Sequence, residues 1–98
     1  MSTYVLAQRV IAEVDEIALY TAGRWGREQS VKYVRELQQR FAWLSENPML
    51  GRARDEVVAG LRSFRQGSHV IFYEVREDQI VIIGIPHVSA DLPDYFEG

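Results

Sequence analysis

Halfway along the chain, the spacing of the apolar residues changes from a helical period to a strand-like one. From about Gln8 to Glu46, apolar residues recur every three or four positions, which is the repeat of an amphipathic helix. From Leu61 onward they alternate with polar residues or form short runs bounded by turn residues, which is typical of β-strands. Helices followed by consecutive strands predict an α+β fold, with the helices packed on one face of a single twisted sheet.

The helical half of the sequence divides into two helices. The first begins at about Gln8, and Gly23 is a natural C-terminal stop. Trp25-Gly26 then forms a tight link to a second helix, which runs to about Glu46 because Asn47-Pro48 disfavours further helix. So short a link folds the two helices into a hairpin. The apolar stripes are Val10, Ile11, Val14, Ile17, Ala18 and Thr21 in the first helix, and Val31, Val34, Leu37, Phe41 and Leu44 in the second.

The strands are predicted from β-prone runs between turn residues. Thr3–Leu6 opens the chain as a short strand, residues 47–60 form a loop, and the tail His87–Gly98 is irregular or a short turn. The run Ile80–Ile83 is apolar on both faces and suits a central strand. The first strand joins the sheet by a crossover made of the helical hairpin. The other three strands form an antiparallel meander and are Leu61–Gln66, Ser68–Val75 and Gln79–Ile85.

Length and composition bound the class of protein. The 98 residues allow a single domain, spanning residues 1–98. The chain has no cysteine, so disulfides and thiolate metal sites do not hold it together. It carries no charged-then-apolar leader and no apolar run of about 18 residues or more. We therefore expect a protein that works in a reducing, cytoplasmic setting without membrane attachment.

The charges are distributed unevenly. The net charge of −3 argues against non-specific nucleic-acid binding. Residues 50–76 contain five arginines against three acids, whereas residues 77–98 contain five acids and no lysine or arginine. Strand alternation should turn Arg62 and Phe64 to one face, and Ser63 and Arg65 to the other. Arginine suits bidentate contacts to carboxylate or phosphate. The cluster therefore indicates either a binding site for such groups or an ordinary solvated edge; its members are Arg52, Arg54, Arg62 and Arg65.

The sequence offers little for catalysis. It contains no common nucleotide-binding, metalloprotease or serine-hydrolase motif, and we expect neither a metal nor a cofactor. His87, Ser89 and Asp91 lie close together, but a catalytic triad draws its members from separate elements, so a hydrogen-bonded turn is favoured. His69 is interpreted as a structural histidine at a strand start. Trp43 lies off the apolar stripe and is a candidate for an exposed protein-binding face.

The chain as a whole resembles the ParE branch of the ParE/RelE superfamily, the toxins of bacterial type II toxin–antitoxin modules. The resemblance covers about residues 4–96. It rests on several elements at family spacing: Tyr4-Val5-Leu6, Asp15-Glu16-Ile17, Tyr20-Thr21, Arg24-Trp25-Gly26, Gly60-Leu61-Arg62-Ser63-Phe64, the run from Gly67 to Tyr73, and Ile85-Pro86-His87-x-Ser89-x-Asp91.

This resemblance implies a function as well as a fold. ParE proteins act by inhibiting DNA gyrase rather than by cleaving RNA, and they serve plasmid stabilisation. A ParD-like antitoxin with a ribbon-helix-helix DNA-binding part neutralises them in a hetero-oligomer, which contacts DNA only through the antitoxin. Contacts to antitoxin or gyrase are then expected at Arg52, Arg54, Arg62, Arg65, His69, Tyr73, Trp43, His87, Ser89, Asp91 and Tyr95.

Two alternatives stay open. One is a RelE-like ribosome-dependent mRNA interferase. Such enzymes carry cationic side chains and a C-terminal tyrosine, and by the resemblance these would correspond to Arg52, Arg54, Arg62 and Tyr95. The other is a non-toxic ParE-like module that serves only complex formation and autoregulation. The chain also departs from the ParE pattern, since Gly84 stands where an arginine is usual, Ala90 where a methionine is usual, and the tail is acidic.

Overall fold

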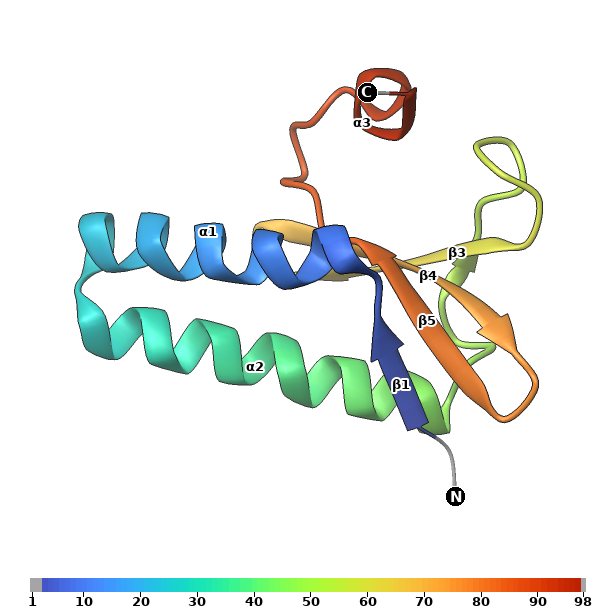
Figure 1. Cartoon of the computed structure of the whole chain (residues 1–98), viewed down its shortest axis with the longest axis horizontal. Coiled ribbons are helices and arrows are strands. Elements are labelled where there is room, and N and C mark those ends of the chain that lie inside the picture. The colour runs from blue at the N-terminus through green and yellow to red at the C-terminus, as the bar shows by residue number, and fades with distance from the viewer. Residues whose placement is uncertain (1–2, 98) are drawn as a thin grey trace.

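The structure is a computed structural model that describes residues 3–97 (Figure 1). It confirms the predicted α+β fold, with a helical hairpin packed against a mixed sheet. The elements in chain order are β1 (Thr3–Leu6), α1 (Gln8–Trp25), α2 (Arg27–Glu46), β2 (Arg52–Ala53), β3 (Leu61–Gln66), β4 (His69–Arg76), β5 (Gln79–Gly84) and α3 (Leu92–Glu97).

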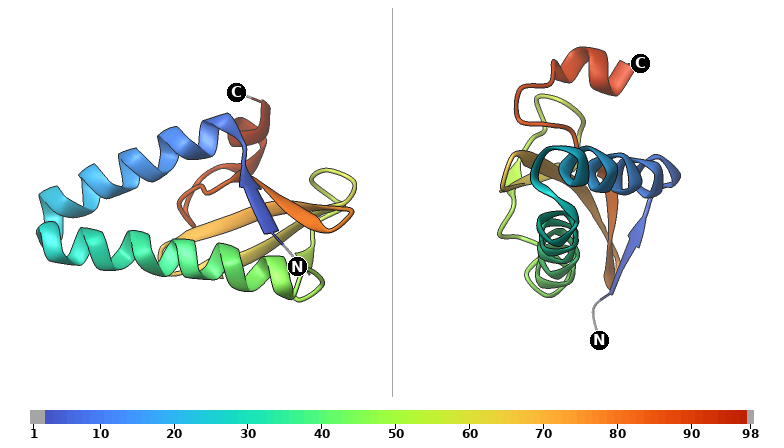
Figure 2. Two further views of the ribbon diagram at one scale, coloured as in Figure 1. Left: turned by 60° about the horizontal axis from the view of Figure 1, so that its bottom comes forward. Right: turned by 90° about the vertical axis from the view of Figure 1, so that its left-hand side faces the viewer.

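The two long helices form the predicted hairpin, but its link is shorter than expected. Helix α1 continues through Gly23 to Trp25, so the predicted stop at Gly23 is wrong. Gly26 alone makes the turn with a φ of +94°, a conformation that a side chain disfavours. The Ser30 hydroxyl on α2 donates to the Ala18 carbonyl on α1 at 2.7 Å and ties the helices together. The closed end of the hairpin, at Gly26, extends past the sheet (Figure 2).

The sheet has five strands in the order β1-β5-β4-β3-β2. Strand β1 pairs in parallel with β5, as the crossover through the helices requires, and the other neighbours are antiparallel. The fifth strand was not predicted: within residues 47–60, Arg52 and Ala53 pair with Ser63 and Arg62 at the edge of the meander. Two residues carry too little pattern to indicate a strand, so only the pairing with β3 defines it.

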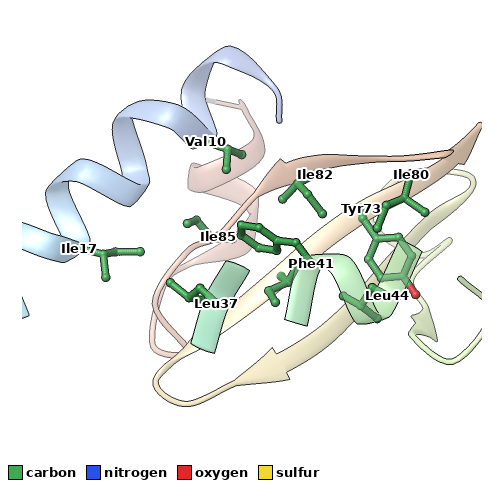
Figure 3. Close-up of a cluster of buried hydrophobic side chains, with 10 residues drawn as sticks. Val10, Ile17, Leu37, Phe41, Leu44, Tyr73, Ile80, Ile82 and Ile85 are labelled. Carbon is green, nitrogen blue, oxygen red and sulfur yellow. The ribbon is translucent and has the colours of Figure 1, made fainter. Parts of the chain in front are cut away.

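The core lies between the hairpin and one face of the sheet (Figure 3). Phe41 and Tyr73 are its largest side chains, and Tyr4 packs on Phe41 with ring centroids 5.5 Å apart. Two members of the predicted stripes, Ile11 and Val31, are about half exposed. The buried cluster consists of Val10, Ile17, Leu37, Phe41, Leu44, Ile71, Tyr73, Ile80, Ile82 and Ile85.

The tail is more ordered than the sequence predicts. It ends in α3, whose start is held because the Asp91 carboxylate accepts the backbone N–H of Asp94 at 3.1 Å. Phe96 of α3 packs edge-on against Phe72 of β4, with ring centroids 5.0 Å apart. This contact, which joins residues far apart in sequence, accounts for a helix too short to be read from periodicity. Within residues 3–97, no helix is long and apolar enough to cross a membrane.

Candidate functional site

The residues predicted as partner contacts lie mainly in two groups, at opposite ends of the β3–β4 hairpin. The first group surrounds the start of β3 and consists of Arg52, Arg54, Arg62 and Tyr73. The second group lies where β4 begins and the chain leaves β5, and consists of His69, His87 and Ser89. The other predicted contacts belong to neither group: Arg65 is on β3, Trp43 on α2, Asp91 just before α3 and Tyr95 on α3.

Tyr73 and Arg62 support the loop that precedes β2. Tyr73 is fully buried; its hydroxyl donates to the Pro48 carbonyl at 2.8 Å and accepts the Gly51 N–H at 2.9 Å. Arg62 donates to the Gly51 carbonyl at 2.7 Å. Buried backbone groups need such partners, because an unpaired one is destabilising. The prediction that Tyr73 contacts a partner is therefore corrected, because its buried hydroxyl holds this loop. Arg62 supports the same loop through its bond to Gly51.

The other arginines lie on the sheet face that points away from the helices. Arg54 donates to Glu56 at 2.8 Å and to the Ser63 hydroxyl at 3.2 Å, with its guanidinium 5.4 Å from the Phe72 ring centre. The Arg65 Nε donates to the Gly67 carbonyl at 3.1 Å. Arg52 is exposed and forms no side-chain hydrogen bond or ion pair with residues 3–97. Arg52 and Arg65 are thus the members of this group most available to a partner.

Trp43 is only partly free. Its ring packs against Phe64 of β3 with centroids 5.2 Å apart, and the Arg40 guanidinium lies 4.7 Å from its centre. Arg40 also donates to the Gln66 side chain at 2.8 Å. The off-stripe position of Trp43 therefore places the indole over the edge of the β-meander, where 36% of the residue remains exposed.

The second group contains two histidines that face each other. His69 and His87 form an isolated antiparallel bridge, and their ring centroids are 5.6 Å apart. The Tyr33 hydroxyl lies 2.7 Å from His69 Nδ1, and the Ser89 N–H donates to His87 Nδ1 at 3.1 Å. Burial lowers the pKa of His69, and the neighbouring His87 lowers it further. His69 therefore favours its neutral form in the free protein.

His87, Ser89 and Asp91 do not form a catalytic triad. The Ser89 hydroxyl lies 2.7 Å from His87 Nδ1, within one turn of chain. The Asp91 carboxylate instead caps α3 and contacts neither of the other two side chains. These local contacts order the segment after β5. A nucleophile and its base, in contrast, are normally held by separate elements of the fold.

An open groove of about 900 Å³ lies between the helical hairpin and this histidine pair. Its rim at the hairpin is aromatic: Tyr20 is 64% and Trp25 is 67% exposed. Sequence reasoning missed the groove, because its residues come from five separate segments. The signal that was present is Arg24-Trp25-Gly26, which places a large apolar side chain at a turn. The walls include Ile17, Tyr33, His69, Ile85, Pro86 and His87.

Tyr95 closes one end of the groove through contacts that the sequence did not indicate. Its hydroxyl donates to Glu13 of α1 at 2.6 Å, and Glu13 also accepts the Ile85 N–H at 3.1 Å. The Arg9 guanidinium lies 3.9 Å from the centre of the Tyr95 ring. Burial raises the pKa of Tyr95, and the Glu13 carboxylate raises it further. Tyr95 thus ties α3 to both α1 and the end of β5.

The chain is similar to known proteins along most of its length. Residues 4–92 match the family model described as the ParE toxin of the type II toxin–antitoxin system parDE. It is 39% identical over 89 residues to Toxin ParE1 of Caulobacter vibrioides, covering 91% of this chain and 92% of that protein. It is 38% identical over 92 residues to Toxin ParE1 of Mycobacterium tuberculosis, covering 93% and 94%.

A solved structure also shares the fold. The chain superimposes on one described as the chromosomal ParDE TA system from P. aeruginosa with a TM-score of 0.76 and 22% sequence identity. The match covers 91% of this chain and 97% of that one. This match shows the fold. The family model and the two sequence relatives show the family: the chain belongs to the ParE toxins of type II toxin–antitoxin systems.

Proposed function

We propose that this chain is a toxin that acts by binding and inhibiting DNA gyrase, and that a ParD-like antitoxin neutralises it. The observation that carries the binding part of the proposal is the open groove with exposed Tyr20 and Trp25 on its rim. Large aromatic side chains at the edge of a concave surface are enriched in protein–protein interfaces. The proposed mechanism is therefore inhibition by protein binding, and it involves no metal or cofactor.

The antitoxin is proposed to cover the groove and the adjoining sheet edge in a hetero-oligomer. Apolar side chains of the antitoxin would pack on the hairpin side of the groove, where Tyr20 and Trp25 are exposed. Its acidic residues would meet Arg52 and Arg65, on the sheet face away from the helices. In this proposal the toxin reaches DNA only through the antitoxin, and the complex forms in the cytoplasm.

Expression in a bacterial host tests the toxin activity. Induction of the chain alone should stop growth and induce an SOS reporter, and co-expression of the antitoxin from the same operon should restore growth. Purified protein should inhibit DNA supercoiling by gyrase in vitro. Normal growth on induction would favour the non-toxic module, and supercoiling that proceeds unchanged at saturating protein would reject the gyrase target.

The antitoxin surface is tested by variants of the groove rim. Trp25→Ala should weaken the toxin–antitoxin complex by about 2 kcal/mol or more, the effect of a central aromatic contact. Val58→Ala is the matched control, since Val58 is also exposed but lies in the loop before β3. Equal affinities of these two variants would place the antitoxin elsewhere on the molecule.

The mRNA-interferase alternative is tested separately. It needs cations and a tyrosine free to contact RNA, whereas the Tyr95 hydroxyl is engaged by Glu13 and Arg62 supports a loop. Purified protein should therefore leave mRNA intact on translating ribosomes. Codon-specific cuts that disappear in Arg52→Ala would instead establish the enzyme.

A further inference from the structure

The histidine bridge presents two imidazoles on one side of the sheet. Val70 N–H donates to the Pro86 carbonyl at 2.9 Å, and Val88 N–H donates to the Ser68 carbonyl at 2.8 Å. These two bonds flank the facing residues, so His69 and His87 form a non-hydrogen-bonded antiparallel pair. Side chains at such a pair approach most closely, and the two rings meet nearly edge-to-face with centroids 5.6 Å apart.

Each ring has one nitrogen committed to the protein. The Ser89 backbone N–H donates to His87 Nδ1, so that nitrogen is an acceptor and the neutral ring carries its proton on Nε2. His69 Nδ1 is engaged by the Tyr33 hydroxyl, which is itself fixed by the Ser68 N–H at 3.0 Å. The Nε2 atoms are therefore the positions from which both rings can bind a partner.

This arrangement favours an anion over a metal ion. A histidine that binds a metal through Nε2 normally donates its Nδ1 proton to a second group, whereas His87 Nδ1 already accepts one. Once His69 is protonated, in contrast, its Nε2–H and that of His87 can donate together to the oxygens of a carboxylate. Across residues 3–97, neither imidazole contacts a carboxylate, so no internal group competes for these donors.

The other charged groups of the groove leave this position open to an acidic partner. On α1, Glu13 is held by Tyr95 and by the Ile85 N–H, and Glu16 also lines the groove. Arg24 lines it too and, in the part of the chain that is described, forms no ion pair. The remaining titratable groups of the lining are the phenols Tyr20, Tyr33 and Tyr95.

We propose that His69 and His87 form a carboxylate-binding site, at which a segment of the antitoxin places an aspartate or glutamate side chain while its apolar neighbours pack along the groove. This inference rests on the proposed function, because it names the chemistry by which the antitoxin is recognised. Ile17 and Pro86 supply the apolar walls beside the pair, and Arg24 supplies a second positive charge.

The site predicts a pH-dependent affinity. The pKa of His69 is lowered in the free protein, so this ring is mostly neutral at neutral pH. A bound carboxylate favours the imidazolium form, because an opposite charge within hydrogen-bonding distance stabilises it. Binding must then take up a proton on His69, and by linkage the affinity rises as the pH falls through the range in which His69 titrates.

The test uses the full-length toxin and the full-length antitoxin from the same operon. Their dissociation constant is measured at several pH values between about 6 and 8, together with proton uptake by calorimetry in buffers of different ionisation enthalpy. The wild-type complex should be about tenfold tighter at the acidic end, as a charge-assisted contact implies. His69→Gln and His87→Gln should remove most of this slope, and Val88→Ala, at the residue next to the bridge, should retain it.

Imidazole nitrogen NMR of the wild-type complex gives a second readout that does not depend on the variants folding. His69 should become protonated on both ring nitrogens on binding at pH 7. Binding with the same slope in the glutamine variants, or with His69 still neutral, would overturn the carboxylate site while leaving the toxin–antitoxin pairing intact. The absence of binding at every pH would overturn the pairing and this site together.

Discussion

The hydroxyl of Tyr95 lies over the α-carbon of Gly84, in the space that a side chain at position 84 would need. A Cβ built there would overlap the phenol oxygen, so only glycine allows this packing. The same hydroxyl donates to Glu13 at 2.6 Å. Glycine at position 84 thus allows Tyr95 to dock the C-terminal helix against β5 and α1.

Gly84→Ala should displace Tyr95 from β5 and break its hydrogen bond to Glu13. We expect the free energy of unfolding to fall by about 1–3 kcal/mol, as for other overpacked sites, when measured by urea denaturation. Gly23→Ala is the matched control, because nothing lies within 4 Å of its added Cβ inside α1. There alanine should stabilise the helix by about 0.5–1 kcal/mol. Equal effects of the two substitutions would contradict the steric argument.

Tyr73→Phe should destabilise the loop before β2. The change removes the hydroxyl that accepts the Gly51 N–H and donates to the Pro48 carbonyl, and it leaves both groups without that partner. The expected loss in the free energy of unfolding is about 1–3 kcal/mol. Tyr20→Phe, at a residue 64% exposed, should change it by less than about 0.5 kcal/mol. Denaturant unfolding of both variants checks this difference.

Acidification should destabilise the free protein through His69. Burial and the neighbouring His87 lower the pKa of His69 below its usual value of 6.5, so the unfolded chain binds more protons in that window. Stability should therefore fall as the pH drops from about 6.5 through the lowered folded-state pKa, and level off below it. His69→Gln should flatten this part of the profile of melting temperature against pH. An unchanged profile would show that His69 is not the cause of this pH dependence of stability.

Phe41→Ala should remove the centre of the core. Phe41 is fully buried between the sheet and the hairpin and packs on Tyr4. Truncation of a buried phenylalanine reduces the free energy of unfolding by about 3–5 kcal/mol, enough to unfold many small domains. Val31→Ala, on the same helix but 48% exposed, should lose about 1 kcal/mol or less. Circular dichroism melts of the two proteins make the comparison.

The elements with a clear hydrophobic period could be predicted from the sequence. Thr3–Leu6, Leu61–Gln66 and the end of α2 at Glu46 agree with the structure to the residue. The bounds of β4 and β5 differ from the predicted ones by a residue, since strand ends depend on pairing rather than on pattern. Strand β2 and helix α3 escaped prediction because each depends on contacts with another element: β2 pairs with β3, and α3 packs on β4 through Phe96.

The candidate site was less accessible to sequence reasoning. The arginine group looked like one positive surface, but Arg62 supports a loop and Arg54 pairs with Glu56. Such local partners cannot be read from charge counts, because they depend on where a loop returns to the sheet. His69 and His87 were both singled out, yet their pairing follows only from the bridge between the start of β4 and the segment after β5.

The parallel pairing of β1 with β5 also has a consequence for biosynthesis. Thr3 pairs with Gln79, so the first strand to leave the ribosome waits for the last strand before it finds its partner. The helical hairpin can form early from local contacts, whereas closing the sheet joins the two ends of the chain and is correspondingly slow. A nascent chain that ends before Gln79 keeps a β-prone strand unpaired, so the sheet closes only after β5 has been synthesised.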